Sequence, residues 1–249
     1  MESTKTLYYP KSYGWVWNFR DRKHKRKMVI SMKNKENVGG TVGHFSVALG
    51  LFDYINPIFY GVTVITILIK MFGRMTAPTY ILFALGAVIS LIFGLSIPTV
   101  KLIVGLGKMQ FQMPVNLVSF VNTGILLSGI ALVSHVVGVK PLTLLIALLC
   151  AAGIIVLLWY KTGKFNTAAV LIGAVGYLMI YASMITLSIR NAVILPIVLY
   201  GLAICLFVFL CLVGIMSNLK NARVHWVIEI SNVICQFSVA LATVILLCG

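Results

Sequence analysis

Two acidic side chains lie inside long apolar stretches of this 249-residue chain, where an ionised carboxyl is costly. Asp53 lies about 11 residues into the first stretch, and Glu229 lies about five residues into the last one. An acid at the centre of a membrane helix costs about 3 kcal/mol on insertion scales, so an acid retained there indicates a functional site. A buried carboxyl with no cation in its own span holds a proton, a state that proton-coupled sites use.

Further polar side chains share a helix face with each acid, given about 100° of rotation per residue. Three stretches carry such polar stripes. The stripe of the first stretch consists of Asp53, Asn56 and Tyr60, and that of the third consists of Asn116, Ser119 and Thr123. The stripe of the last stretch consists of His225, Glu229, Asn232 and Gln236. Because a polar face is costly in lipid, we expect the three stripes to face one another across a cavity and to bind its solute or ion. The amides and hydroxyls could equally form hydrogen bonds that hold the helices together.

Residue counts from the start of each stretch predict how deep the acids lie. With a rise of 1.5 Å per residue, Asp53 falls roughly 16 Å from the start of its stretch, near the bilayer midplane. Glu229 falls only roughly 7 Å from the start of the last stretch. We therefore expect Asp53 at the floor of the cavity and Glu229, with His225, near its cytoplasmic mouth.

Pro57 follows Asp53 by four residues and removes the backbone hydrogen bond to the Asp53 carbonyl. We expect a kink there, with a backbone acceptor released beside the acid. Broken helices of this kind are typical of ion and substrate sites in transporters, and an ordinary proline kink is an equal alternative.

The spacing of His225 and Glu229, four residues apart on one helix face, would also suit two ligands of a zinc ion. A metal-dependent membrane hydrolase is therefore an alternative. Other histidines do not converge on this pair, because His44 lies about 180° around its helix from Asp53 and His135 lies at the opposite membrane face. We predict that the protein is not an enzyme and that it has no metal, cofactor or catalytic residue.

The composition of the chain indicates which elements carry these residues. Of its residues 60% are hydrophobic and only 10% are charged, which excludes an ordinary soluble domain. A membrane-spanning helix needs roughly 20 apolar residues. Seven stretches qualify, at residues 42–69, 77–98, 114–137, 141–160, 167–189, 192–216 and 224–247. The sequence thus predicts an all-α polytopic membrane protein, a bundle of seven transmembrane helices over residues 42–249.

The basic residues predict the orientation of this bundle, because short cytoplasmic loops retain Lys and Arg. In a seven-span arrangement sixteen of the twenty cations, Lys101 among them, fall on the side of the N-terminus. The other four are Lys70, Arg74, Lys140 and Arg190. We predict a cytoplasmic N-terminus and an external C-terminus, in the plasma (cell) membrane.

Residues 1–41 form a predicted cytoplasmic tail that is both basic and aromatic. Six cations of this tail suit anionic lipid headgroups, and they are Arg20, Arg22, Lys23, Lys25, Arg26 and Lys27. A cytoplasmic protein partner is a second interpretation of the tail. Nucleic-acid binding is not expected, since no recognisable reading module is present.

Together these patterns favour a small integral membrane transporter or channel-like protein for a polar or cationic solute, with proton coupling through Asp53 as one option. The alternative is a non-catalytic membrane subunit or anchor that docks a partner through its basic tail. The lipid bilayer is the expected surrounding, and a homo-oligomer is compatible with either function. The sequence does not name the solute.

Overall fold

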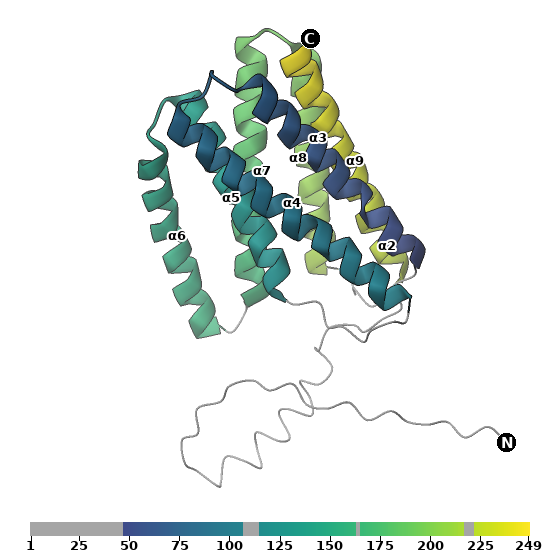
Figure 1. The fold of residues 1–249 in the computed structure, drawn as a ribbon. Helices are drawn as coiled ribbons and strands as arrows, with labels where there is room; N and C mark the ends of the chain where they lie inside the picture. Colours follow the sequence, from purple (N-terminus) through teal and green to yellow (C-terminus); the bar gives the residue numbers. More distant parts are fainter. Residues whose placement is uncertain (1–46, 107–114, 163–164, 217–221) are drawn as a thin grey trace, which may run out of the picture. The chain divides into compact units, whose positions relative to one another are not determined.

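The computed structural model describes the backbone of residues 47–106, 115–162, 165–216 and 222–249. Within these ranges the side chains of residues 104–105, 115–116, 151–152, 154–162, 165–170, 214–216, 222–223 and 225 are not described. The described part is helical, and its helices are α2 (Val47–Asp53), α3 (Ile55–Lys70), α4 (Ala77–Gly105), α5 (Val115–Val137), α6 (Pro141–Thr162), α7 (Phe165–Arg190), α8 (Ile194–Met216) and α9 (Ala222–Cys248) (Figure 1). The predicted all-α class is confirmed. The tail, residues 1–41, lies outside the described residues.

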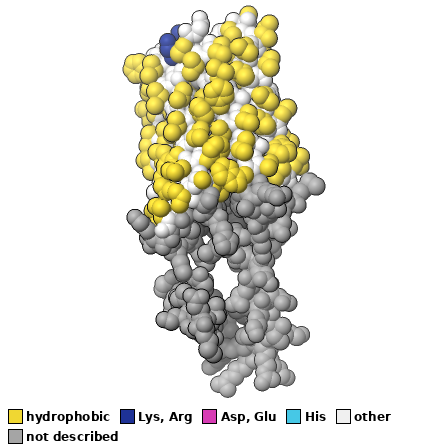
Figure 2. Space-filling view, turned by 90° about the vertical axis from the view of Figure 1, so that its right-hand side faces the viewer, with side chains coloured by type: hydrophobic (Ala, Val, Ile, Leu, Met, Phe, Trp, Pro, Cys, Tyr) yellow, Lys and Arg dark blue, Asp and Glu magenta, His cyan; other side chains and the backbone are white. Residues whose placement is uncertain are grey.

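The outside of the bundle is apolar. Figure 2 shows one face covered mostly by hydrophobic side chains, with Lys or Arg at one end. Large side chains such as Ile58, Val88 and Val198 are at least half exposed. Among the described residues, six helical stretches are long and apolar enough to cross a membrane, formed by α2 with α3, and by α4, α5, α7, α8 and α9. Such an exterior would be a liability in water, so these features indicate a multi-pass membrane protein.

The helical hydrogen bonding of the first span is interrupted beside its acid. Helix α2 ends at Asp53, Tyr54 forms a turn, and α3 begins at Ile55. Around the turn the Tyr54 amide donates to the Leu51 carbonyl at 3.3 Å, a bond from i to i−3. This interruption lies three residues before Pro57, whose missing N–H releases the Asp53 carbonyl. Tyr54 itself keeps a right-handed helical backbone, so the predicted kink stays a prediction.

Helix α4 is longer than predicted, and this corrects the position of Lys101. The helix does not end at Pro98 but continues to Gly105, which places Lys101 inside a helix rather than in a loop. The proline costs one backbone bond, to the Gly94 carbonyl, while the next hydroxyl, Thr99 Oγ1, donates to the Leu95 carbonyl at 2.7 Å. In Figure 1, α4 crosses the bundle obliquely, and its C-terminal end lies beside α2.

Glycines hold α4, α5 and α7 together at backbone distance. A Cβ atom on Gly86 of α4 would lie 2.5 Å from the Gly124 carbonyl oxygen of α5. On the other side of α5, a Cβ atom on Gly176 of α7 would lie 2.7 Å from the Leu126 amide nitrogen. No side chain fits at either contact, so the two contacts fix the rotation of α5 about its axis.

Helix α9 packs on the opposite side of the bundle, between α3 and α8. Rings of Phe59 and Phe237 meet edge to face with centroids 5.3 Å apart, which joins α3 to α9. The Tyr200 and Thr243 hydroxyls lie 2.6 Å apart and join α8 to α9. The peripheral α6 contacts chiefly α5 and α7 (Figure 1). This arrangement leaves space in the middle, between α3 with α9 and the group of α4, α5 and α7.

Candidate functional site

A polar cavity of about 230 Å³ lies between α2 with α3, α4, α5, α7 and α9. This volume exceeds that of a single water molecule several times over. Its polar lining consists of Asp53, Asn56, Tyr60, Ser90, Lys101, Tyr177, Glu229, Asn232 and Gln236. Its apolar lining consists of Pro57, Gly94, Ile97, Pro98, Val121, Ile125 and Ile228. The cavity therefore has the mixed character of a small-molecule site, with an apolar wall and a few placed polar groups.

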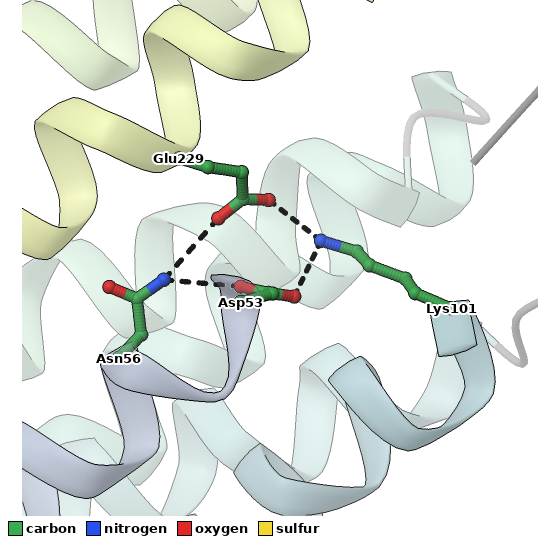
Figure 3. A network of polar contacts seen from close by, with 4 residues as sticks. All are labelled: Asp53, Asn56, Lys101 and Glu229. Carbon is green, nitrogen blue, oxygen red and sulfur yellow. Dashed lines mark hydrogen bonds and ion pairs between the residues drawn. The ribbon is translucent and has the colours of Figure 1, made fainter. Parts of the chain in front are cut away.

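An ion-pair network lies at one end of this cavity (Figure 3). The Lys101 ammonium donates to Asp53 Oδ2 and to Glu229 Oε1, each at 2.7 Å. Asn56 Nδ2 donates to the second oxygen of each carboxylate, at 3.1 Å to Asp53 and 3.3 Å to Glu229. The two carboxylates are thus bridged twice, once by an ammonium and once by an amide.

Three separate parts of the chain position the network. Asp53 is the last residue of α2 and Asn56 lies in the first turn of α3; because Tyr54 between them keeps a right-handed helical backbone, their spacing of three residues places both side chains on the same side. The Tyr54 hydroxyl itself bonds the Thr99 hydroxyl of α4 at 2.7 Å, two residues before Lys101. Glu229 comes from the N-terminal part of α9.

The network is buried, which makes its charge balance important. Asp53, Asn56 and Glu229 are 6%, 8% and 7% exposed. Buried charges require partners, because removal from water costs several kcal/mol per ion in effective terms. Among the described side chains that line the cavity, two carboxylates face a single ammonium, so one formal negative charge is unmatched.

Two buried polar atoms of the cavity lining have no hydrogen-bond partner among the described residues, namely Asn56 Oδ1 and Tyr60 Oη. Figure 3 shows the Asn56 oxygen pointing away from the three charged side chains. Tyr60 lies four residues further along α3 and lines the same cavity. Since nearly all buried polar atoms are hydrogen-bonded, these two atoms indicate that the cavity holds water or a polar solute.

The cavity ends in the packed core of the bundle. Tyr60, Tyr177 and Gln236 line it and also border a much smaller space of about 10 Å³. The walls of that smaller space are mainly apolar and include Val64, Ile67 and Phe83. These apolar walls separate the cavity from the far end of the bundle.

Six of the ten predicted site residues line this cavity. They are Asp53, Asn56 and Tyr60 from the first span, and Glu229, Asn232 and Gln236 from the last. The predicted meeting of these two stripes is therefore observed. The side chains of Asn116 and His225 lie outside the described residues.

Ser119 and Thr123, the described side chains of the third stripe, do not line the cavity. Thr123 is exposed and its hydroxyl donates to the Ser119 carbonyl of its own helix at 2.8 Å, while the cavity wall on α5 is formed by Val121 and Ile125. The physical reason is the backbone packing at Gly124, which fixes the rotation of α5 and turns Ser119 and Thr123 away.

The predicted difference in depth between the acids is also wrong. Asp53 and Glu229 lie at one level, because both contact the same Lys101 nitrogen.

Sequence reasoning missed Lys101, the central cation of the site. It was assigned to a loop because it follows Pro98, a common end of a helix. The signal that could have found it is the apolar sequence Leu102–Leu106 on its far side, which shows that Lys101 interrupts an apolar stretch rather than ending it. Ser90 and Tyr177 were missed as well.

No group of three or more His, Cys, Asp or Glu side chains that could hold a metal ion is present in the part of the chain that the structure describes. His135 lies at the far end of α5, in its last turn. Compared with known proteins, the chain matches no family, no curated protein and no solved structure. Its function must therefore be argued from the cavity.

Proposed function

We propose that this protein is a small membrane transporter or channel-like protein for a polar or cationic solute, and that the cavity at Asp53, Lys101 and Glu229 is its binding site. The observation that carries the proposal is a solute-sized polar cavity, inside an apolar helical bundle, with more carboxylates than cations. An unmatched charge is costly in this environment, so a bound cation would stabilise the site. A proton on either carboxyl would balance the same charge, which makes proton coupling part of the proposal.

We also propose seven spans, in which α6 is added to the six stretches described above. A parallel pair of neighbouring helices supports this count. Asn122 and Leu126 of α5 meet Gly173 and Gly176 of α7 in the same order, so α5 and α7 run in the same direction. The chain between them must then return along the bundle, and the 22 residues of α6 give a helix of roughly 33 Å, enough for a bilayer of about 30 Å.

The orientation remains the one predicted from the basic residues, a cytoplasmic N-terminus in the cell membrane. Lys101 no longer counts as a loop cation, which leaves fifteen cations on the N-terminal side against four on the other. The asymmetry still strongly favours this orientation. The network and the cavity then lie toward the cytoplasmic side, since Asp53 and Glu229 both lie in the N-terminal parts of the first and last spans.

The network joins the two helix groups that flank the cavity, which suggests how transport would proceed. Asp53 and Glu229 belong to α2 and α9, whereas Lys101 belongs to α4, which is packed tightly against α5. A bound cation that replaces Lys101 as the partner of one carboxylate would weaken the link between the two helix groups. Relative movement of two helix groups around a fixed site is the general mechanism of alternating access.

The first experiment is native mass spectrometry of the full chain extracted gently from its membrane, followed by uptake assays in proteoliposomes. A monomer or homo-oligomer with a small bound molecule, lost on Asp53→Asn, is expected, and the same substitution should abolish uptake of that molecule. A stable hetero-complex whose activity tolerates Asp53→Asn but is lost on deletion of residues 1–27 would refute the transporter and leave the membrane-subunit alternative.

A further inference from the structure

We infer that the solute is a small primary ammonium compound with an apolar body, bound beside the Lys101 ammonium on the Asp53 and Glu229 carboxylates. This inference rests on the proposed function and narrows its solute class. Four properties of the site carry it, namely charge, hydrogen-bond geometry, coordination number and the apolar wall.

The charge of the site fits one monovalent cation. The carboxylates of Asp53 and Glu229 face only Lys101 among the described charged side chains of the lining. One added monocation balances that excess, whereas a divalent ion or a zwitterionic amino acid leaves a net charge in a membrane-embedded cavity. A neutral alcohol leaves the excess unchanged.

The hydrogen-bond geometry fits N–H donors. The carboxylates already accept from an ammonium at 2.7 Å, a normal distance for a charged N–H···O bond. Asn56 is 8% exposed, and its Oδ1 atom has no partner among the described residues; the same holds for the Tyr60 hydroxyl oxygen. The carboxylate oxygens and these two oxygens are all acceptors, so the cavity favours a solute with N–H donors; a primary ammonium carries three and a quaternary ammonium carries none.

The coordination number disfavours a dehydrated inorganic cation. Hard divalent cations take about six to eight oxygen ligands in a tight shell. The oxygen groups of the network itself are two carboxylates and one amide, and the carboxylates are shared with Lys101. The space of about 230 Å³ is also far larger than an ion.

The remaining wall fits a small apolar body. Ile97 and Pro98 of α4, Val121 and Ile125 of α5, and Ile228 of α9 line the cavity. Tyr177 also lines it, away from the network, and its ring adds to the aromatic and apolar surroundings. An ammonium group at the carboxylates and a hydrocarbon group against this wall would together occupy the cavity.

The test measures thermal unfolding of the purified full chain in lipid nanodiscs with four probes of similar size or charge. Benzylammonium should raise the unfolding temperature in a saturable manner. Benzyl alcohol, benzyltrimethylammonium and sodium chloride at equal concentration should act at least tenfold more weakly. Asp53→Asn and Asn56→Ala should each weaken benzylammonium binding at least tenfold, while Ser96→Ala, an exposed position on α4 whose hydroxyl bonds its own helix, should not.

The outcomes separate this inference from the proposed function. Preferential stabilisation by sodium, by the alcohol or by the quaternary ammonium, if lost on Asp53→Asn, overturns the ammonium inference and leaves a transporter of another solute class. Benzylammonium binding that persists in both variants also overturns it, because binding then lies elsewhere. Transport of an identified solute that is insensitive to Asp53→Asn would instead overturn the proposed function.

Discussion

Lys101 and Glu229 lie 128 residues apart in the sequence, yet the Lys101 ammonium and a Glu229 carboxylate oxygen are 2.7 Å apart. The same ammonium is 2.7 Å from Asp53, so one cation connects the C-terminal part of α4 to the first and last spans. Removal of the cation would leave two buried carboxylates facing each other. The charge state of this network should therefore control both stability and transport.

Lys101→Met should destabilise the protein strongly. Breaking a buried ion pair by removing one partner costs about 3–5 kcal/mol, since the remaining charge is left uncompensated. We expect a lower unfolding temperature and a lower yield of monodisperse protein in size-exclusion chromatography. Adding Glu229→Gln should recover most of the loss, because the double variant again has one unmatched carboxylate. Lys70→Met, at an exposed helix end, is the control, and equal damage there would contradict a specific role of Lys101.

Asp53→Asn should abolish transport with little effect on folding. The side chain keeps its shape, and Lys101 keeps its bond to Glu229, but the carboxylates no longer outnumber the cation. Uptake into proteoliposomes and the unfolding temperature would be measured on the same preparation. Loss of transport accompanied by an equal loss of folded yield would show that Asp53 serves structure alone.

Gly124→Ala should disturb the packing of α4 against α5. A Cβ atom there would lie 2.5 Å from the Gly86 carbonyl oxygen, and overpacking of this kind costs about 1–3 kcal/mol. Gly201→Ala on α8 is the matched control, since a Cβ atom at that position meets nothing within 4 Å. Thermal unfolding should separate the two variants. If Gly124→Ala is as stable as Gly201→Ala, the helices are not in backbone contact.

Cysteine labelling should show that the cavity is accessible to water-soluble reagents, and from which side of the membrane they enter it. In a chain whose five native cysteines are replaced, Asn232→Cys lies in the cavity wall, whereas Ile234→Cys on the same helix is exposed on the apolar outside. A charged thiol reagent applied to the cytoplasmic face should modify the first and not the second. Labelling of Asn232→Cys only from the external face would refute the proposed orientation.

Much of the fold follows from the length and hydrophobicity of the apolar stretches. Helix length and side-chain transfer energies are local properties, which is why the all-α class could be predicted. The end of α4 could not, because whether a helix continues past Pro98 depends on tertiary contacts. Lys101 gains two carboxylates by remaining helical, and those carboxylates come from distant parts of the sequence.

The candidate site was predictable where polarity alone determined the rotation of a helix. This holds for α3 and α9, whose polar faces have few other ways to avoid lipid. It fails for α5, where Gly124 and Gly129 permit backbone contact with two neighbours and so decide which face is turned inward. In α5 the positions of the glycines predict which face is turned inward better than the positions of Ser119 and Thr123 do.

The position of Lys101 between two acids also bears on the order in which the chain is assembled. During synthesis Asp53 enters the membrane first, and the second long helix delivers its counter-ion within 48 residues. Glu229 is synthesised 128 residues after Lys101, when the ammonium is already present in the membrane. The first two spans therefore contain a matched ion pair before the rest of the bundle is made, and the ammonium of that pair is available to bind Glu229 of the last span.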